Sequence, residues 1–112
     1  MQNKNFQKIK YKIFEKKKFP NDIFGLRIIY TLNDNLTNDN LIKHEYAYYI
    51  KDLIQNNYLT LDLFYNDYIQ TPKINNYQSI HIYVINQLLI EIQIRDNFMH
   101  YNAINGSASN YF

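Results

Sequence analysis

The sequence predicts an α+β domain, in which a small mixed β-sheet is flanked by helices. Three observations support this prediction. Residues 23–30 are rich in β-branched and aromatic types and predict a buried strand, residues 38–56 show helical spacing, and residues 77–95 hold two strand-like segments. With 112 residues, the chain has room for a single domain over residues 1–112.

The composition excludes several classes of protein. A hydrophobic content of 46% and an aromatic content of 17% are too high for a disordered tail. A mean hydropathy of −0.48 and the lack of a long apolar run exclude a membrane span. Because the sequence has no cysteine, disulfides and thiolate metal sites are excluded, and a cytoplasmic location fits best.

The charge pattern points away from an obligatory nucleic-acid partner. The net charge is only +2, and the basic excess lies almost entirely in residues 4–18. Lysine and asparagine are abundant throughout, as in proteins from AT-rich genomes, so an individual lysine carries little information. Arginine occurs only twice, at Arg27 and Arg95, despite this bias. These two residues are therefore stronger candidates for a functional role than any lysine.

The first 20 residues are a basic arm. Lysines alternate there with apolar residues, and the arm ends at Phe19-Pro20, where proline disfavours helix at the residue before it. This pattern favours a short basic helix or an extended segment. The strand at 23–30 follows and is closed by the turn-forming residues 33–35.

The main helix is predicted over residues 38–56. Thr37 or Asn38 is suited to cap its N-terminus, and its apolar residues recur every three or four positions, at Ile42, Tyr46, Tyr49, Ile50 and Leu53. Residues 58–76 mix aromatic, acidic and turn-forming types and predict a long loop. Long ordered loops often carry function.

A hairpin is predicted after this loop. Its strands cover residues 77–85 and 88–95, and the connection Asn86-Gln87 places an asparagine where a positive φ is tolerated. A final helix is predicted from Phe98 to Gly106.

The two hairpin strands each carry a polar face. Side chains alternate across a strand, so Glu91, Gln93 and Arg95 share one face. On the other strand one face holds Tyr77, Ser79, His81 and Tyr83. Either these faces form the solvated side of the sheet, or they coincide and bring a carboxylate, an amide, a guanidinium and an imidazole together as a ligand site.

A second carboxylate, Asp22, precedes the first strand, on which Arg27 also lies. Magnesium takes hard oxygen ligands and commonly uses one or two carboxylates together with substrate phosphates. Asp22 and Glu91 therefore make a candidate magnesium pair. The alternative for Asp22 is that it caps a turn.

Five short segments of the sequence together point to a protein family. They are residues 22–27, 67–73, 75–81, 91–95 and the pair Met99-His100, and in order and spacing they resemble the synthetase domain of RelA/SpoT proteins. The resemblance runs from about Lys16 to the C-terminus. Its most specific parts are the strings Tyr-Gln-Ser-Ile-His and Glu-Ile-Gln-Ile-Arg.

The resemblance implies a nucleotidyltransferase-like synthetase core that acts as a GTP/GDP pyrophosphokinase. In that reaction the 3′-hydroxyl of GDP or GTP attacks the β-phosphate of ATP, expels AMP and yields (p)ppGpp. Asp22 and Glu91 would bind Mg²⁺, and Glu91 would also assist removal of the hydroxyl proton. Tyr77 would stack on guanine. The other contacts to the acceptor nucleotide would come from Lys73, Asn75, His81 and Gln93. The phosphate contacts would come from Arg27 and Arg95.

The sequence departs from the family at several places. The family's arginine- and lysine-bearing helix, which grips ATP phosphates, belongs ahead of Met1, so we expect the domain to be incomplete at its start. The charged loop motif matches only at Asp67, and Ile104 and Asn110 replace a glutamate and a histidine. Asn76 stands where the family has glycine, and asparagine is the next-best residue for a positive φ.

Three hypotheses follow for function. The first is an alarmone synthetase, with ATP and GDP or GTP as its partners. The second is a catalytically impaired remnant that still binds guanine nucleotide. The third is an interaction module that docks through the basic arm, and the sequence also leaves open whether identical copies assemble.

Overall fold

The chain forms one mixed β-sheet with helices packed against it, as expected. The structure is a computed structural model that describes residues 10–18, 23–32 and 40–106. Its strands are β1 (Lys10–Lys18), β2 (Ile23–Thr31), β3 (Leu59–Thr60), β4 (Asn66–Asp67), β5 (Ile80–Asn86) and β6 (Leu88–Asp96). Its helices are α2 (Asn40–Asn57), the short 3₁₀ helix η1 (Asp62–Phe64) and α3 (Asn97–Asn105).

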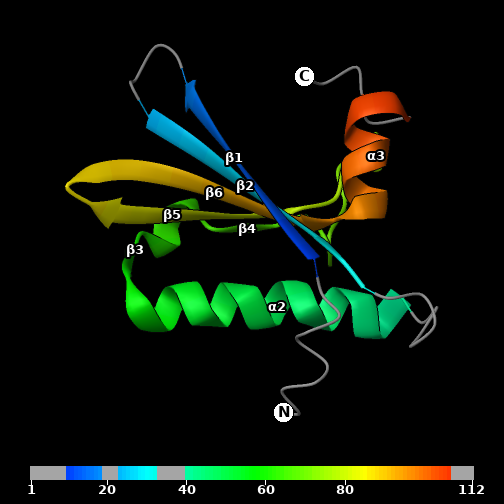
Figure 1. Ribbon diagram of the computed structural model, residues 1–112, viewed down its shortest axis with the longest axis horizontal. Coiled ribbons are helices and arrows are strands. Elements are labelled where there is room, and N and C mark those ends of the chain that lie inside the picture. The colour runs from blue at the N-terminus through cyan, green and yellow to red at the C-terminus, as the bar shows by residue number, and fades with distance from the viewer. Residues whose placement is uncertain (1–9, 19–22, 33–39, 107–112) are drawn as a thin grey trace.

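The strand order across the sheet is β1-β2-β6-β5-β3, and β4 also pairs with β5. Strand β2 runs parallel to β6, while the β1–β2, β5–β6, β3–β5 and β4–β5 pairs are antiparallel. Helix α2 lies along one side of the sheet, and α3 sits at the end of β6 opposite the hairpin tip (Figure 1). The predicted α+β class with a mixed sheet is therefore confirmed.

The hydrophobic core lies between the sheet and α2. Apolar side chains of β5 and β6 alternate with polar ones, so one face of the hairpin is apolar and packs toward the helix. Tyr30 of β2 adds a tether, because its hydroxyl donates to the Lys43 carbonyl oxygen at 2.5 Å. The buried core residues are Tyr30, Leu32, Ala47, Ile50, Ile54, Ile69, Ile80, Ile82, Val84, Ile92, Ile94 and Met99.

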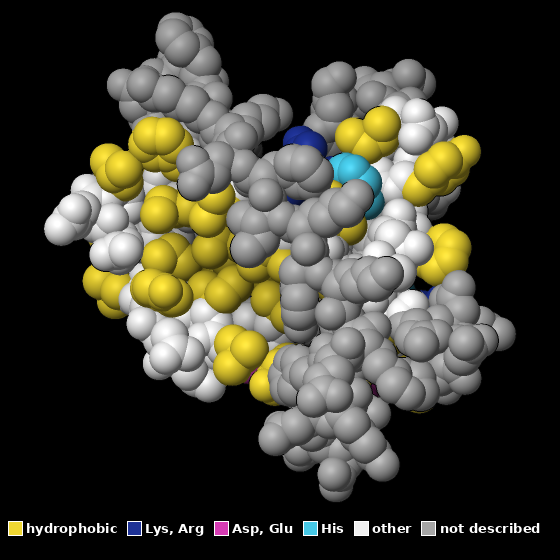
Figure 2. All heavy atoms as spheres, viewed as in Figure 1, with side chains coloured by type: hydrophobic (Ala, Val, Ile, Leu, Met, Phe, Trp, Pro, Cys, Tyr) yellow, Lys and Arg dark blue, Asp and Glu magenta, His cyan; other side chains and the backbone are white. Residues whose placement is uncertain are grey.

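Hydrophobic side chains also gather on part of the surface, at the left of the view in Figure 2. In Figure 1 this is the end of the molecule that carries the hairpin tip and β3. Leu59, Ile85 and Leu88 are exposed at that end. Among the described helices, none is long and apolar enough to cross a bilayer.

Of the two conformations predicted for the basic arm, the extended one is confirmed for residues 10–18. These residues form a strand that pairs along its whole length with β2, a pairing that was not predicted. A short isolated helix is marginal in water, whereas pairing with β2 satisfies backbone groups along the strand. The rest of the predicted arm lies outside the described residues.

The hairpin turn also differs from the prediction. The positive φ, 64°, belongs to Gln87 and not to Asn86, which pairs with Leu88 as the last residue of β5. By contrast, Asn76 has a φ of 70°, which confirms that asparagine adopts the left-handed conformation at the position where the family has glycine. The predicted main helix and final helix are confirmed within one or two residues.

We predict that Ile82→Ala destabilises the domain by about 2–5 kcal/mol, because it opens a cavity in the core beneath α2. Ile82 is 1% exposed. The matched control is Ile74→Ala, since Ile74 is 99% exposed and should change the free energy of unfolding by less than about 0.5 kcal/mol. Urea unfolding followed by circular dichroism measures both, and equal losses would contradict the assigned core.

Candidate functional site

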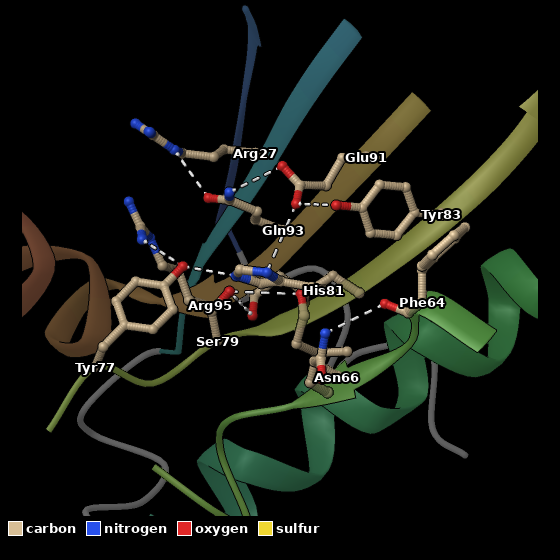
Figure 3. Close-up of polar contacts among 12 residues, drawn as sticks. Arg27, Phe64, Asn66, Tyr77, Ser79, His81, Tyr83, Glu91, Gln93 and Arg95 are labelled. Carbon is tan, nitrogen blue, oxygen red and sulfur yellow. Dashed lines mark hydrogen bonds and ion pairs between the residues drawn. The ribbon is translucent and has the colours of Figure 1, made fainter. Parts of the chain in front are cut away.

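The two polar faces of the hairpin coincide. Tyr83 lies directly opposite Glu91, and His81 lies opposite Gln93, so their side chains meet on the face of the sheet away from the apolar core (Figure 3). This face is buried, with Glu91 only 2% exposed and Arg95 1% exposed. The alternative of a solvated sheet face is therefore wrong for these residues.

Glu91 is the carboxylate at the centre of the site. Its Oε2 atom accepts a hydrogen bond from the Tyr83 hydroxyl at 2.7 Å and lies 3.7 Å from Nδ1 of His81. Its Oε1 atom accepts from Nε2 of Gln93 at 3.3 Å. A buried carboxylate needs such donors, since an unpaired charge in the interior is costly.

A chain of polar contacts leads from Glu91 across the face. Nε2 of His81 lies 2.8 Å from the Tyr77 hydroxyl, which accepts a long hydrogen bond of 3.5 Å from Nη1 of Arg95. Nη2 of Arg95 lies 2.8 Å from Nδ1 of His100, on α3. Because a guanidinium only donates, Nδ1 of His100 is the acceptor. The network links the carboxylate at one end to a guanidinium at the other.

The two arginines form a cationic flank of the site. Arg27 of β2 donates from Nε to Oε1 of Gln93 at 3.2 Å. Burial lowers the pKa of Arg95, and the charge of Arg27 lowers it further. Within the described part of the chain neither arginine forms an ion pair with a carboxylate, and Nε of Arg95 is buried without a hydrogen-bond partner. A flank of this kind is suited to an anion.

Tyr77 is enclosed by other side chains. It is 1% exposed, and the rings of Tyr68 and His81 meet it edge-on, with centroids 6.0 and 5.6 Å away. Burial raises the pKa of Tyr77. Nζ of Lys73, an exposed residue, lies 5.3 Å from the Tyr77 ring centroid and 4.8 Å from that of Tyr68. Lys73 therefore lies over the Tyr77 ring as part of this enclosure.

The loop before Tyr77 is held by its own asparagines. Oδ1 of Asn75 accepts from the Tyr77 backbone N–H at 3.2 Å, and the Asn76 N–H donates to the Lys73 carbonyl at 2.8 Å. Nδ2 of Asn102 on α3 donates to the Asn76 carbonyl at 3.2 Å. These contacts fix a tight turn, so Asn75 shapes the loop in addition to any role toward a ligand.

Two features of the site do not follow from the sequence pattern. Alternation predicts that Tyr83 lies on the polar face, but it does not predict the contact of Tyr83 with Glu91. Asp67 accepts from the Tyr48 hydroxyl at 2.6 Å and from the N–H groups of Ile69 and Gln70, and this ties the loop to α2. Tyr48 and Asp67 are far apart in sequence, and no local signal links them.

Of the two residues expected to bind magnesium, one lies in the described part of the chain. Glu91 supplies hard oxygen atoms on the polar face, while Asp22 lies outside the described residues. The described residues contain no group of three or more metal-ligating side chains. Magnesium held by one or two carboxylates and substrate phosphates needs no larger cluster, so the residues fit that ion.

A sequence model of the region found in RelA / SpoT proteins matches residues 1–111. A putative ankyrin repeat protein of Rickettsia felis is 40% identical over 83 residues, which cover 71% of this chain and 7% of that protein. A probable GTP diphosphokinase of Oryza sativa subsp. japonica is 30% identical over 92 residues, covering 80% of this chain and 11% of that protein. A probable guanosine-3′,5′-bis(diphosphate) 3′-pyrophosphohydrolase of Mycoplasma pneumoniae is 36% identical with the same coverage.

Solved structures share the fold. Small alarmone synthetase 2 from Bacillus subtilis superposes with a TM-score of 0.53 at 25% identity, covering 79% of this chain and 48% of that chain. A GTP pyrophosphokinase family protein from Streptococcus pneumoniae gives 0.54 at 23% identity, covering 85% and 46%. The chain thus spans less than half of each solved structure and at most 11% of these curated relatives.

We predict that Tyr77→Phe lowers the free energy of unfolding by about 1–3 kcal/mol, because it removes the buried hydroxyl that contacts Nη1 of Arg95 and Nε2 of His81. Tyr101→Phe is the matched control, since Tyr101 is exposed on α3. Urea unfolding of the two variants checks the prediction. A Tyr77→Phe protein as stable as the control would mean that the hydroxyl contributes nothing to the network.

Proposed function

Because the chain belongs to the RelA/SpoT family, we propose that it acts as a GTP/GDP pyrophosphokinase, which transfers pyrophosphate from ATP to the 3′-hydroxyl of GDP or GTP. Its fold is that of the alarmone synthetases. The proposal draws on one relative that is named as a GTP diphosphokinase and on solved structures named as synthetases.

The observation that carries the proposal is the buried carboxylate Glu91 beside a cationic flank. Phosphoryl transfer asks little covalent chemistry of the protein, which must mainly hold the groups in line and offset charge on phosphate oxygens. Arg27 and Arg95 supply positive charge without a carboxylate partner among the described residues, and Glu91 supplies oxygen ligands. A site for phosphates and a divalent cation has these components.

We assign the metal to Glu91 and Asp22. Magnesium bound there would withdraw charge from the phosphate oxygens during transfer. Glu91 would also take the proton from the 3′-hydroxyl of the acceptor. The His81 ring is held by the Tyr77 hydroxyl at Nε2, and its Nδ1 atom lies beside the Glu91 carboxylate. His81 would therefore help to keep this carboxylate in place next to the acceptor.

The acceptor nucleotide is assigned to the loop and to the start of β5. Guanine would stack on Tyr77 once Lys73 leaves the ring and turns to a phosphate. Stacking of this kind is worth roughly 1–3 kcal/mol. We assign the acceptor contacts to Asn75, His81 and Gln93. We assign the phosphate contacts to Arg27 and to Nε of Arg95, which has no hydrogen-bond partner among the described residues.

ATP is the assigned donor, and the cytoplasm, where these nucleotides are available, is the assigned compartment. A second candidate is a chain that binds guanine nucleotide but transfers pyrophosphate poorly. It is favoured by the burial of Glu91, which is 2% exposed and accepts a hydrogen bond at each carboxylate oxygen. Binding without turnover would select this candidate.

We predict that labelled ATP incubated with GDP, Mg²⁺ and the protein yields ppGpp and AMP, and that Glu91→Gln lowers the rate by at least about a hundredfold. Glutamine keeps the shape of the side chain but removes the charge. Glu45→Gln, at an exposed position of α2, is the control and should leave the rate unchanged. Nucleotide separation measures the product, and equal rates for the two variants would contradict the role of Glu91.

A further inference from the structure

Tyr83 makes a short contact with the site carboxylate, Glu91. It faces Glu91 directly across the β5–β6 pair, and its hydroxyl donates to Oε2 at 2.7 Å (Figure 3). A hydrogen bond from a hydroxyl to a charged carboxylate is about twice as strong as one between neutral groups. The contact therefore fixes the Glu91 side chain more firmly than the 3.3 Å contact from Gln93 does.

The Tyr83 ring is itself held in place. Phe64 of η1 packs against it, with ring centroids 5.6 Å apart and an interplanar angle of 59°. An ionised carboxylate only accepts hydrogen bonds, so the Tyr83 hydroxyl is the donor in this contact.

The two oxygen atoms of Glu91 are consequently not equivalent. Oε2 lies between the Tyr83 hydroxyl and Nδ1 of His81. Oε1 points to the side of Gln93, which in turn contacts Arg27 on the cationic flank. One oxygen is thus engaged by the neighbouring strand, and the other faces the part of the site assigned to phosphates.

We infer that Tyr83 is a positioning residue, which anchors Oε2 of Glu91 and presents Oε1 to the magnesium ion. The inference rests on the proposed function, because it takes Glu91 as a metal ligand. Hydrogen-bond partners of metal-ligating carboxylates orient the ligand, and losing one typically costs about 10–100-fold in metal affinity. Tyr83 would act through Glu91, without touching the metal.

Glutamate-specific isotope labelling gives a direct test. The chain has three glutamates, Glu15, Glu45 and Glu91, so the protein labelled with ¹³C at the glutamate carboxyls shows three resolvable signals. The full chain is titrated with Mg²⁺ alone. Tyr83→Phe removes the hydroxyl and keeps the ring that packs on Phe64, and Tyr101→Phe removes an exposed hydroxyl elsewhere.

We expect the Glu91 signal of the wild-type protein and of Tyr101→Phe to shift at the same Mg²⁺ concentration. In Tyr83→Phe the midpoint should rise about tenfold while unfolding by urea is little changed. Superimposable Glu91 titrations in all three proteins would overturn the role of Tyr83 and leave the metal assignment standing. A Glu91 signal that Mg²⁺ does not move in any of them would instead overturn the metal assignment and, with it, the inference.

Discussion

The antiparallel register of β5 and β6 is the constraint on which the rest of the structure depends. With Tyr83 opposite Glu91 and His81 opposite Gln93, the apolar side chains of both strands face α2 and the polar ones face away. A slip of one residue would exchange the two faces and bury the charges against the helix. The same pairing therefore builds the core and the site.

Burying this polar face has an energetic consequence. Glu91 can be tolerated in the interior because Tyr83, His81 and Gln93 lie against it, and each of its two oxygen atoms accepts a hydrogen bond. Arg95 is less well satisfied, since within the described part of the chain its Nε atom has no hydrogen-bond partner, and burial lowers its pKa. Under the proposed function, a phosphate at this flank would relieve that cost.

Much of the fold and the composition of the site could be predicted from the sequence, because both follow from periodicity. Alternation over residues 77–95 was enough to predict that the polar faces meet, and Asn76 was enough to predict a left-handed turn. The pairing of residues 10–18 with β2 was not predicted, because it is a tertiary contact. For the same reason the enclosure of Tyr77 and the Tyr48–Asp67 contact could not be foreseen.

The central claim, that the buried polar face receives nucleotide phosphates, can be measured through the two arginines of the chain. Each gives one Nε–H signal in a ¹⁵N spectrum of the full-length protein, and Arg27 and Arg95 both lie on the cationic flank. With Mg²⁺ present, addition of GDP should shift both signals, and guanosine, which has no phosphate, should leave them close to their starting positions. GDP that binds and shifts other residues while both arginine signals stay fixed would contradict the account.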